Sequence, residues 1–450
     1  MLNSCKKDKD IYVTGLSLNK TYTIIMTGNS ETLEATVSPS DAIDKSLTWS
    51  SSDVSVATVN EGTVTALKEG KAVITVTAAN GKIATCNVTV MEPFSSGDGS
   101  SDAPYLINNA ADLGKLSDLV NAGDSIYAAA GKWYRLTDNI TLPTDSLGES
   151  NFTPIGTQTN RFHGNFDGNG KTIDSLTINT ASGYAGLFGW VRDGIIQNLG
   201  LTNVSISGGR YTGGIAGLIQ NWFSDSGITG CYVTGSVSGT SNVGGIAGFI
   251  GNNSSIMGCY VYGSVSSTSS NVGGIVGYAS GTVSNCYTTC SVSSTWDSVG
   301  GIAGNIYGGS ISNCYATGDI SGINDCGGIA GANLGTVSDC VALNPRITRV
   351  SGDFVSFGRV VGYGTGSLTN NAAFSDMTAD GGINFSSGDN NGTDITAAVA
   401  KTQSTYSDSP RNWTFGVSIE SPWRWGLSSS YPLPTLYWQA AASTLPAHLN

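Results

Sequence analysis

Between Gly183 and Phe374 the chain repeats one pattern of small, apolar and polar residues about seven times. The clearest mark is Gly-Gly-Ile-Ala-Gly or a close variant, and its copies start at Gly213, Gly244, Gly273, Gly300 and Gly327, a period of 27–31 residues. A unit this short cannot bury its own apolar face unless it stacks on its neighbours. The fixed period therefore predicts a solenoid.

The polar positions within each repeat indicate strands. Runs such as Gly-Ser-Val-Ser place one apolar residue between small polar ones, which is the alternation of a half-buried strand. The repeats are rich in Gly, Ser, Thr, Val, Ile and Tyr, with few strong helix formers. We therefore expect a parallel β-helix, of the right-handed kind, in which successive coils rise by about 4.8 Å.

A second mark in each repeat indicates a local bend. A Gly, Asn or Asp precedes a Cys at Gly230, Gly258, Asn285, Asn313 and Asp339, and Asn198 and Asn370 hold the matching places in the outer coils. These residue types tolerate a left-handed backbone. Such a bend would reset the alternation, so that Ile311 and Cys314 both point inward while Tyr315 points outward.

This phase predicts a thiol ladder inside the solenoid. It consists of Cys231, Cys259, Cys286, Cys314 and Cys340, and Leu199 continues it at one end. A buried free Cys behaves as a small apolar group. Adjacent coils lie within disulfide reach, so the residues leave the pairing of these thiols open. We expect no metal site and no cofactor, because no Cys-x-x-Cys pair with His partners is present.

The same phase places a tyrosine ladder on the outer surface. It consists of Tyr232, Tyr260, Tyr287 and Tyr315, with Tyr262 and Trp222 as neighbours on the same coils. Exposed rings about one coil apart can stack on successive sugar residues of a polymer. Two alternatives remain open: the rings stabilise the solenoid by stacking on each other, or a loop covers them.

Other segments flank the repeats. Residues 11–91 contain alternating strands separated by turns, as in a β-sandwich, and residues 92–103 read as a Gly/Ser-rich linker. Leu113, Leu116, Leu119 and Val120 have helical spacing, which predicts an N-terminal capping helix for a solenoid spanning 104–375. Residues 376–450 lose the period and become aromatic, so we expect them to cap the final coil.

Residues 11–91 resemble the bacterial immunoglobulin-like domains of intimin and invasin type. The resemblance rests on Leu47-Thr48-Trp49-Ser50-Ser51-Ser52-Asp53, on Val56-Ala57-Thr58-Val59 and on Gly62-Thr63-Val64-Thr65-Ala66. It implies a stalk or spacer at a cell surface, with Trp49 as a core residue.

Residues 104–375 resemble GLUG-repeat proteins. The resemblance rests on Phe162-His163-Gly164-Asn165-Phe166-Asp167-Gly168-Asn169-Gly170, on Gly186-Leu187-Phe188-Gly189 and on the repeats themselves. Proteins with this motif include bacterial adhesins and the non-catalytic parts of some IgA-cleaving metallopeptidases. The resemblance implies a β-helical exoprotein and no particular reaction.

Charge and the first residues bear on the location. The net charge of −12 has no basic counterweight, which argues against a nucleic-acid partner. Leu2-Asn3-Ser4-Cys5, followed by Lys6-Lys7-Asp8, resembles the end of a lipoprotein signal of Bacteroidetes surface lipoproteins. The resemblance implies that Cys5 carries a lipid, that residues 1–10 are a tether, and that the protein faces outward from the outer membrane.

Catalysis is weakly indicated. His163 with Asp167 is the best acid/base pair, but Phe-Asp-Gly-Asn-Gly is also typical of a turn in which Asp167 binds its own backbone. We therefore expect a non-enzymatic cell-surface adhesin that binds an extended polysaccharide, or a host surface glycan or protein, through the tyrosine ladder. The alternatives are a polysaccharide lyase or hydrolase on a β-helix, and a structural subunit of a surface assembly.

Overall fold

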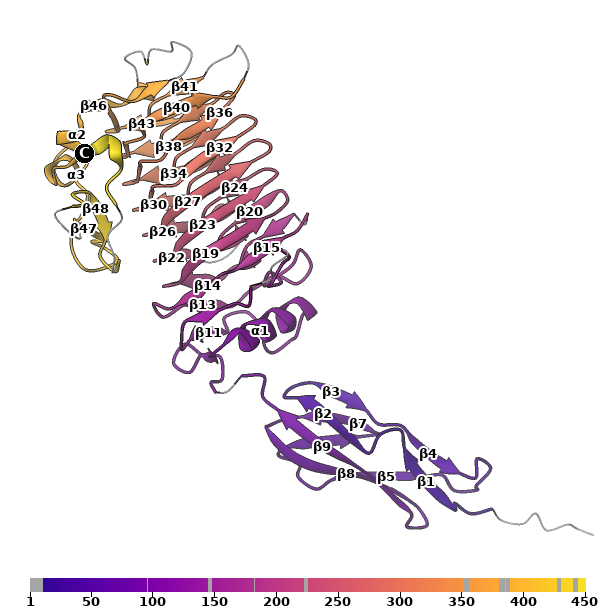
Figure 1. The fold of residues 1–450 in the computed structure, drawn as a ribbon. Coiled ribbons are helices and arrows are strands. Elements are labelled where there is room, and N and C mark those ends of the chain that lie inside the picture. Colours follow the sequence, from indigo (N-terminus) through magenta and orange to yellow (C-terminus); the bar gives the residue numbers. More distant parts are fainter. Residues whose placement is uncertain are drawn as a thin grey trace, which may run out of the picture. The chain divides into compact units, whose positions relative to one another are not determined.

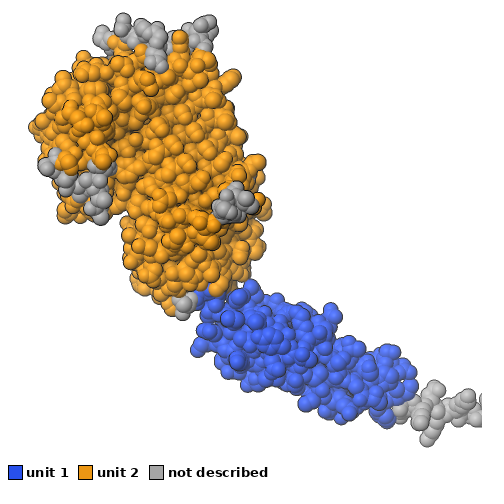
Figure 2. Space-filling view, viewed as in Figure 1, with its two compact units in different colours: residues 1–95 blue, residues 96–450 orange. Residues whose placement is uncertain are grey.

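The computed structural model describes the chain except residues 1–10, 95, 145–147, 182, 222–225, 352–355, 380–384, 386–388, 427–429 and 440–443. Two compact units divide the chain, residues 1–95 and residues 96–450 (Figure 2). Both are built almost entirely of strands, so the all-β prediction is confirmed. No helix among the described residues is long and apolar enough to cross a membrane.

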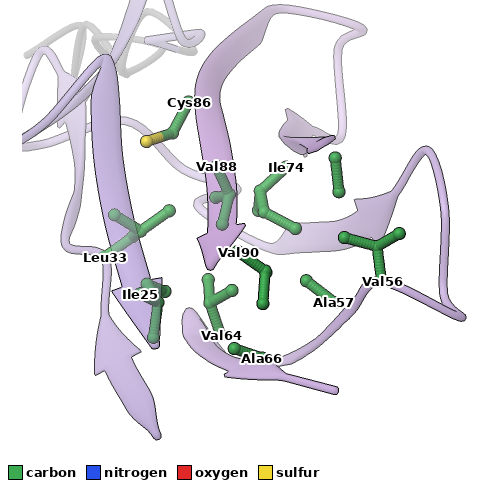
Figure 3. Packing of buried hydrophobic residues seen from close by; sticks show 11 residues of the cluster. Ile25, Leu33, Val56, Ala57, Val64, Ala66, Ile74, Cys86, Val88 and Val90 are labelled. Carbon is green, nitrogen blue, oxygen red and sulfur yellow. The ribbon is translucent and has the colours of Figure 1, made fainter. Parts of the chain in front are cut away.

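The first unit is an immunoglobulin-like sandwich. Its strands are β1 (Gly15–Leu18), β2 (Tyr22–Met26), β3 (Ser30–Thr32), β4 (Ala35–Ser38), β5 (Leu47–Ser51), β6 (Ala57–Asn60), β7 (Thr63–Ala66), β8 (Gly70–Ala78) and β9 (Ile83–Met91). The two larger sheets have the orders β2-β9-β8-β5 and β3-β7-β6, and β1 pairs separately with β4. Inward-facing residues such as Ile74, Val64 and Val88 form the core between the two larger sheets (Figure 3). Trp49 packs against this core.

The second unit is a parallel β-solenoid, as predicted. One coil runs through β20 (Tyr211–Gly213), β21 (Ala216–Gln220), β22 (Ser226–Thr229) and β23 (Tyr232–Gly239). Each strand pairs in parallel with its counterpart one coil further on, so that Tyr232 aligns with Tyr260 and Val233 with Val261. The stacked strands form three walls, whose layers are visible in Figure 1.

The strands of each wall follow in chain order. The long wall contains β10 (Tyr105–Ile107), β11 (Trp133–Leu136), β13 (Asn165–Asp167), β17 (Phe188–Arg192), β18 (Ile195–Gln197), β21, β22, β25 (Ala247–Ile250), β26 (Ser254–Met257), β29 (Val276–Ala279), β30 (Thr282–Ser284), β34 (Ala303–Ser312), β38 (Ala330–Ser338), β42 (Val361–Gly364) and β43 (Ser367–Thr369). The tyrosine wall contains β12 (Ile140–Thr141), β14 (Thr172–Asp174), β15 (Thr177–Asn179), β19 (Gly200–Ser207), β23, β27 (Tyr260–Ser267), β31 (Tyr287–Thr288), β32 (Ser291–Ser294), β35 (Tyr315–Ala316), β36 (Ile320–Gly322), β39 (Val341–Ala342), β40 (Arg346–Arg349), β44 (Ala372–Phe374), β45 (Thr378–Ala379) and β46 (Thr393–Ile395). The short wall contains β16 (Tyr184–Ala185), β20, β24 (Val243–Gly244), β28 (Val272–Gly273), β33 (Val299–Gly300), β37 (Cys326–Gly327) and β41 (Phe357–Gly358).

The glycine motif marks the corner between the short and long walls. A Cβ atom on Gly245 would lie 2.4 Å from the carbonyl oxygen of Gly274 in the next coil. A Cβ on Gly274 would likewise lie 2.2 Å from the oxygen of Gly301. The backbones of adjacent coils therefore approach so closely here that only Gly fits, which explains why the motif recurs with the period of the fold.

The predicted left-handed bend is present in every coil in which the sequence indicates it. The seven φ angles are +53° at Asn198, +64° at Gly230, +60° at Gly258, +53° at Asn285, +53° at Asn313, +54° at Asp339 and +57° at Asn370. After the bend Cys314 is fully buried, as is Ile311 before it. The inference that the bend resets the strand phase is therefore confirmed.

A helix lies at the N-terminal end of the solenoid, as expected. Helix α1 (Ala110–Ala122) begins at Asn109, whose side chain accepts a hydrogen bond from the backbone N–H of Asp112, and ends at left-handed Gly123. Leu113 and Leu116 are fully buried. Figure 1 shows α1 beside β11, at the first coils.

The C-terminal segment only partly matches the expected cap. Strand β46 does extend the tyrosine wall at the last coil by pairing with β44. The chain then passes through α2 (Ala397–Ala400), α3 (Ser404–Ser407), β47 (Trp423–Trp425) and β48 (Pro434–Leu436). These elements lie along the side of the solenoid rather than on its end (Figure 1), where they meet the tyrosine wall.

Candidate functional site

The thiol ladder lies in the solenoid interior. Cys231, Cys259, Cys286, Cys314 and Cys340 are all fully buried and all carry free thiols. The backbone N–H of Cys259 donates to Sγ of Cys286 at 3.4 Å. In the last coil Asn371 replaces the Cys, and its Oδ1 accepts from the N–H of Cys340 at 2.9 Å. Cys286, Cys314 and Asn371 therefore each satisfy a buried backbone donor of the preceding coil.

Complete burial keeps these thiols away from solvent, and for several of them it also disfavours the thiolate. It raises the pKa of Cys286 and of Cys314 well above the ordinary thiol value, and it raises the pKa of Cys290, which lies outside the ladder, to about 12. Cys259 is the exception: desolvation opposes its ionisation, but hydrogen bonds from Cys231 and Cys286 lower its pKa. The reactive form of Cys is the thiolate, which burial disfavours. These cysteines therefore have a structural role.

The tyrosine ladder is a continuous stack. Ring centroids are 4.9 Å apart between Tyr232 and Tyr260, 5.3 Å between Tyr260 and Tyr287, and 4.9 Å between Tyr287 and Tyr315. The planes of Tyr287 and Tyr315 differ by 5°. Such stacking stabilises neighbouring coils along the outside of the tyrosine wall.

The prediction that the tyrosine ladder forms an exposed face is wrong for three of its four rings. Tyr260 is 7% exposed, while Tyr287 and Tyr315 are completely buried beneath the C-terminal segment. The hydroxyl of Tyr315 donates to the carbonyl oxygen of Pro434 at 2.7 Å. The hydroxyl of Tyr287 donates to Oε1 of Gln439 at 2.8 Å.

The physical reason for this cover is the apolar character of both surfaces. The indole of Trp423 is fully buried, 6.0 Å from the ring of Tyr315, and donates to Oδ1 of Asn285 at 3.2 Å. Trp413 stacks on Trp423 at 4.7 Å. Burying both sets of rings removes a large apolar area from water. Tyr262 also lies in this contact, hydrogen-bonded to Tyr287, whereas Trp222 lies outside the described residues.

The half-buried Tyr232 lines a cavity at one end of the ladder. This cavity has a volume of about 400 Å³ and is lined by Gly170, Asn198, Leu199, Gly200, Gly230, Tyr232, Tyr260 and Trp438. The ring of Trp438 stacks on that of Tyr260 at 5.4 Å. The cavity is thus small and shared between the wall and the C-terminal segment.

A different aromatic surface runs along the outside of the long wall and the adjoining short wall. We call it the outer aromatic row: Trp190, Tyr184, Tyr211, Phe249 and Tyr278, all half-buried. Successive centroids lie 4.8 Å apart for Trp190 and Tyr184, 5.5 Å for Tyr184 and Tyr211, 5.8 Å for Tyr211 and Phe249, and 5.4 Å for Phe249 and Tyr278. The row therefore presents five rings to solvent across four coils.

The sequence contained a signal for this row that was missed. The residue directly after each glycine motif is Leu218, Phe249, Tyr278, Asn305 or Ala332, and Trp190 and Tyr363 follow the flanking variants. These positions share one register along the wall. Directly after Trp190, Phe249 and Tyr278 come the buried residues Val191, Ile250 and Ala279. Because successive side chains of a strand point to opposite faces, this places the three aromatic side chains on the outer side.

A cleft adjoins the first rings of the row. It has a volume of about 630 Å³ and is lined by Thr153, Pro154, Gly156, Thr157, Gln158, Thr159, Thr180, Gly183, Tyr184, Arg210 and Tyr211. Arg210 lies over the ring of Tyr211 at 4.9 Å, and Arg161 lies over the ring of Trp190 at 4.5 Å. Burial raises the pKa of Tyr184, and the two nearby guanidinium groups oppose that rise.

Asp167, one half of the candidate acid/base pair with His163, makes contacts that stabilise the fold. Asp167 accepts from the backbone N–H of Asn169 at 2.9 Å, which is the turn that the sequence suggested. Its other contacts are Arg135 at 3.1 Å and the side chain of Asn198 at 3.1 Å. Burial lowers the pKa of His163, which favours the neutral imidazole. In the described part of the chain no three His, Cys, Asp or Glu side chains gather where they could hold a metal ion.

Comparison with known families supports the domain architecture. Residues 12–88 match the bacterial Ig-like domain (group 2), and residues 298–321 match the GLUG motif. The immunoglobulin-like and GLUG resemblances are therefore confirmed for these segments. This combination, with its solenoid, is that of an extracellular surface protein.

Similar proteins share only part of their length with this chain. Halomucin from Haloquadratum walsbyi is 32% identical over 169 residues, which cover 36% of this chain and 2% of halomucin. A protein of Evansella cellulosilytica, provisionally described as a Gly-rich membrane protein, is 34% identical over 138 residues, or 28% of this chain and 15% of that protein. The chain thus spans a small fraction of these relatives.

One solved structure resembles most of the chain. A Bacteroides ovatus protein, provisionally described as an immunoglobulin A1 protease, superposes with a TM-score of 0.53 at 22% identity, covering 77% of this chain and 96% of that one. At this identity the likeness shows the fold alone.

Proposed function

We propose that this protein is a non-enzymatic surface protein that binds an extended glycan along the outer aromatic row. The observation that carries the proposal is the row itself, five half-buried rings 4.8–5.8 Å apart on the outside of the solenoid. Contiguous apolar patches on a protein surface mark interaction sites.

The spacing of the rings suits a polymer. Coils of a parallel solenoid rise by about 4.8 Å, so a sugar chain lying along the row meets a new ring with nearly every residue. The exposed part of each ring offers apolar surface to the C–H groups of a sugar. A contact of this kind contributes about 0.5–1.5 kcal/mol, so binding needs several rings at once and a polymer is favoured over a monosaccharide.

The proposal is tested by measuring binding of residues 11–450 to a panel of neutral and acidic polysaccharides. The double variant Phe249→Ala/Tyr278→Ala should weaken binding about 5- to 150-fold, which corresponds to two ring contacts. Trp296→Ala is the matched control, because Trp296 is 55% exposed on the same solenoid but lies away from the row. Unchanged affinity in the double variant would contradict the proposal.

The same assay separates the alternatives. Release of unsaturated or reducing ends from a bound polymer would show that the protein is a polysaccharide-degrading enzyme and not only a binding protein. The Asp167→Asn variant would then test whether His163 and Asp167 act as the acid/base pair. Binding to no polymer, together with concentration-dependent self-association, would favour a structural subunit instead.

We also propose that Cys5 carries a lipid that anchors the protein at the outer membrane. The proposal rests on the lipoprotein-like residues 2–5 and on the surface-protein architecture. Residues 1–10 lie outside the described residues. Metabolic labelling with palmitate in a host that processes lipoproteins should label the protein and not its Cys5→Ala variant; labelling of neither, or of both equally, would contradict the anchor.

A further inference from the structure

The cleft beside the outer aromatic row has the size and wall chemistry of a sugar subsite. Its volume of about 630 Å³ lies within the range of about 300–1,000 Å³ that is common for ligand pockets. The rings of Tyr184 and Tyr211 provide an apolar wall. Thr157, Gln158 and Thr159 provide hydroxyl and amide groups on another side, which are suited to the hydroxyls of a sugar.

One guanidinium group, that of Arg210, lines this cleft, and a second, that of Arg161, lies beside it near Tyr184; each lies on an aromatic face. Arg210 is exposed and lies over Tyr211, and Arg161 lies over Trp190. A guanidinium stacked in this way is held in place by cation–π contact, while the N–H groups at its edge stay free to donate. The stacking therefore positions both groups in advance of a ligand.

Neither guanidinium is neutralised by the described part of the protein. The ion pairs of the described residues include Arg192 with Asp193 at 3.5 Å, but none involves Arg161 or Arg210. The Nε atom of Arg161 is buried and has no hydrogen-bond partner. A buried N–H without a partner is costly, so the guanidinium of Arg161 has hydrogen-bonding capacity that the described residues leave unused.

The positive charge of Arg161 and Arg210 is opposite in sign to the net charge of the whole chain. The protein carries a net charge of −12, so an anionic polymer would be repelled by most of its surface. His163 lies near Arg161 and the Arg192–Asp193 pair, and burial lowers its pKa, which favours the uncharged imidazole. Two cations outside the ion pairs of the described residues, beside half-buried rings, are therefore a local exception.

From this geometry we infer that the cleft binds a carboxylate-bearing sugar residue, such as a uronic acid, of the polymer that lies on the outer aromatic row. The sugar packs against the exposed parts of Tyr184 and Tyr211, and its carboxylate accepts hydrogen bonds from Arg210 and from the guanidinium of Arg161 beside the cleft. Arg suits this role because its planar fork matches the two oxygens of a carboxylate. The inference rests on the proposed glycan-binding function and assigns that site an acidic ligand.

The test compares each acidic polymer with its own carboxyl-reduced form. Polygalacturonate, alginate and hyaluronan, each native and carboxyl-reduced, are titrated against residues 11–450 by calorimetry at two salt concentrations. The native form of at least one polymer should bind more tightly than its reduced form, and salt should weaken only the native form. Arg210→Gln and Arg161→Gln should each weaken that binding about 10- to 100-fold and leave the reduced polymer unaffected.

Three controls keep the outcome clear. Arg346→Gln removes an exposed cation from β40, away from the cleft, and should change nothing. Arg161→Lys retains the charge but not the fork, and should retain part of the binding. Thermal unfolding checks that each variant is folded.

Each outcome decides between the proposals. Equal binding of native and reduced polymers that depends on Phe249 and Tyr278 but not on the arginines would overturn the acidic subsite and leave the glycan proposal standing. Binding of no polymer, neutral or acidic, would overturn both.

Discussion

Replacing Trp423 by Ala should detach the C-terminal segment from the tyrosine ladder without unfolding the solenoid. The indole is fully buried between the segment and the wall, where it stacks on Trp413 and lies 6.0 Å from the ring of Tyr315. Its Nε1 donates to Asn285 at 3.2 Å. The solenoid core lies on the other side of the wall and is closed by its own interior residues, so it does not depend on this indole.

The magnitude follows from the buried area. A Trp side chain buries about 150–250 Å², which at about 25 cal/mol per Å² corresponds to about 4–6 kcal/mol. Part of this area stays covered in the detached state, so we expect a loss of about 3–5 kcal/mol, as is usual for Trp→Ala. The population of the detached state should then rise about a hundred- to a few-thousand-fold.

Hydrogen exchange and limited proteolysis measure this population. Amides of residues 404–426 should exchange faster by that factor, while those of β27 and β34 keep their protection. Trypsin should cut faster after Arg411, whose guanidinium donates to the carbonyl oxygen of Thr405 at 2.6 Å, and after Arg424. Val417→Ala is the matched control, since Val417 lies in the same segment and is 82% exposed.

Two results would refute the reasoning. Unchanged exchange over residues 404–426 would mean that the indole does not hold the segment. Loss of protection in β27 and β34 together with the segment would mean that the cover and the solenoid unfold as one unit.

Three further predictions concern the solenoid itself. Asn313 has a φ of +53°, so Asn313→Ala should lower the free energy of unfolding, measured by chemical denaturation, by about 1–2 kcal/mol. Asn313→Gly should lower it less, and equal losses in the two variants would argue against a backbone cause. In a protein of residues 11–450 the eight described cysteines should all resist Ellman's reagent in the native state and should all react with it in denaturant. Fewer than eight reactive thiols after denaturation would reveal disulfides. Hydrogen bonds from Thr202, Ser175 and Asn203 lower the pKa of Asp174, so its carboxylate stabilises the fold above about pH 4 and this stability is lost as the pH falls through the lowered pKa. Asp174→Asn should therefore lower the thermal midpoint at pH 7, with a difference that shrinks toward pH 2; a constant difference would contradict the linkage.

The features that the sequence predicted correctly depend on neighbouring residues. The left-handed bend could be placed at Asn285 and Asn313 because the tolerance of Gly, Asn and Asp for positive φ is a property of single residues. The solenoid could be recognised because each coil contacts mainly the coils beside it, and therefore repeats the same requirements at a fixed period. The helix at Leu113 and Leu116 followed from spacing and capping in the same way.

The features that the sequence did not reveal depend on distant contacts. Whether Tyr287 and Tyr315 face solvent depends on residues more than a hundred positions later, such as Pro434 and Gln439. These lie in a segment without a period, so no regularity indicates where it packs. The outer aromatic row was overlooked because Leu218 interrupts its register, and only the folded coils bring Tyr211 over to fill that gap beside Phe249.

The pairing of Arg161 with Trp190 and of Arg210 with Tyr211 shows both kinds of contact. Arg210 and Tyr211 are adjacent in the chain, whereas Arg161 and Trp190 are brought together by one full coil. Local backbone preference and periodicity thus determined the solenoid and the direction of its side chains. Which of the outward side chains meet water was determined by packing between segments far apart in the chain, because the hydrophobic effect acts on whatever apolar surface remains uncovered once the coils have formed.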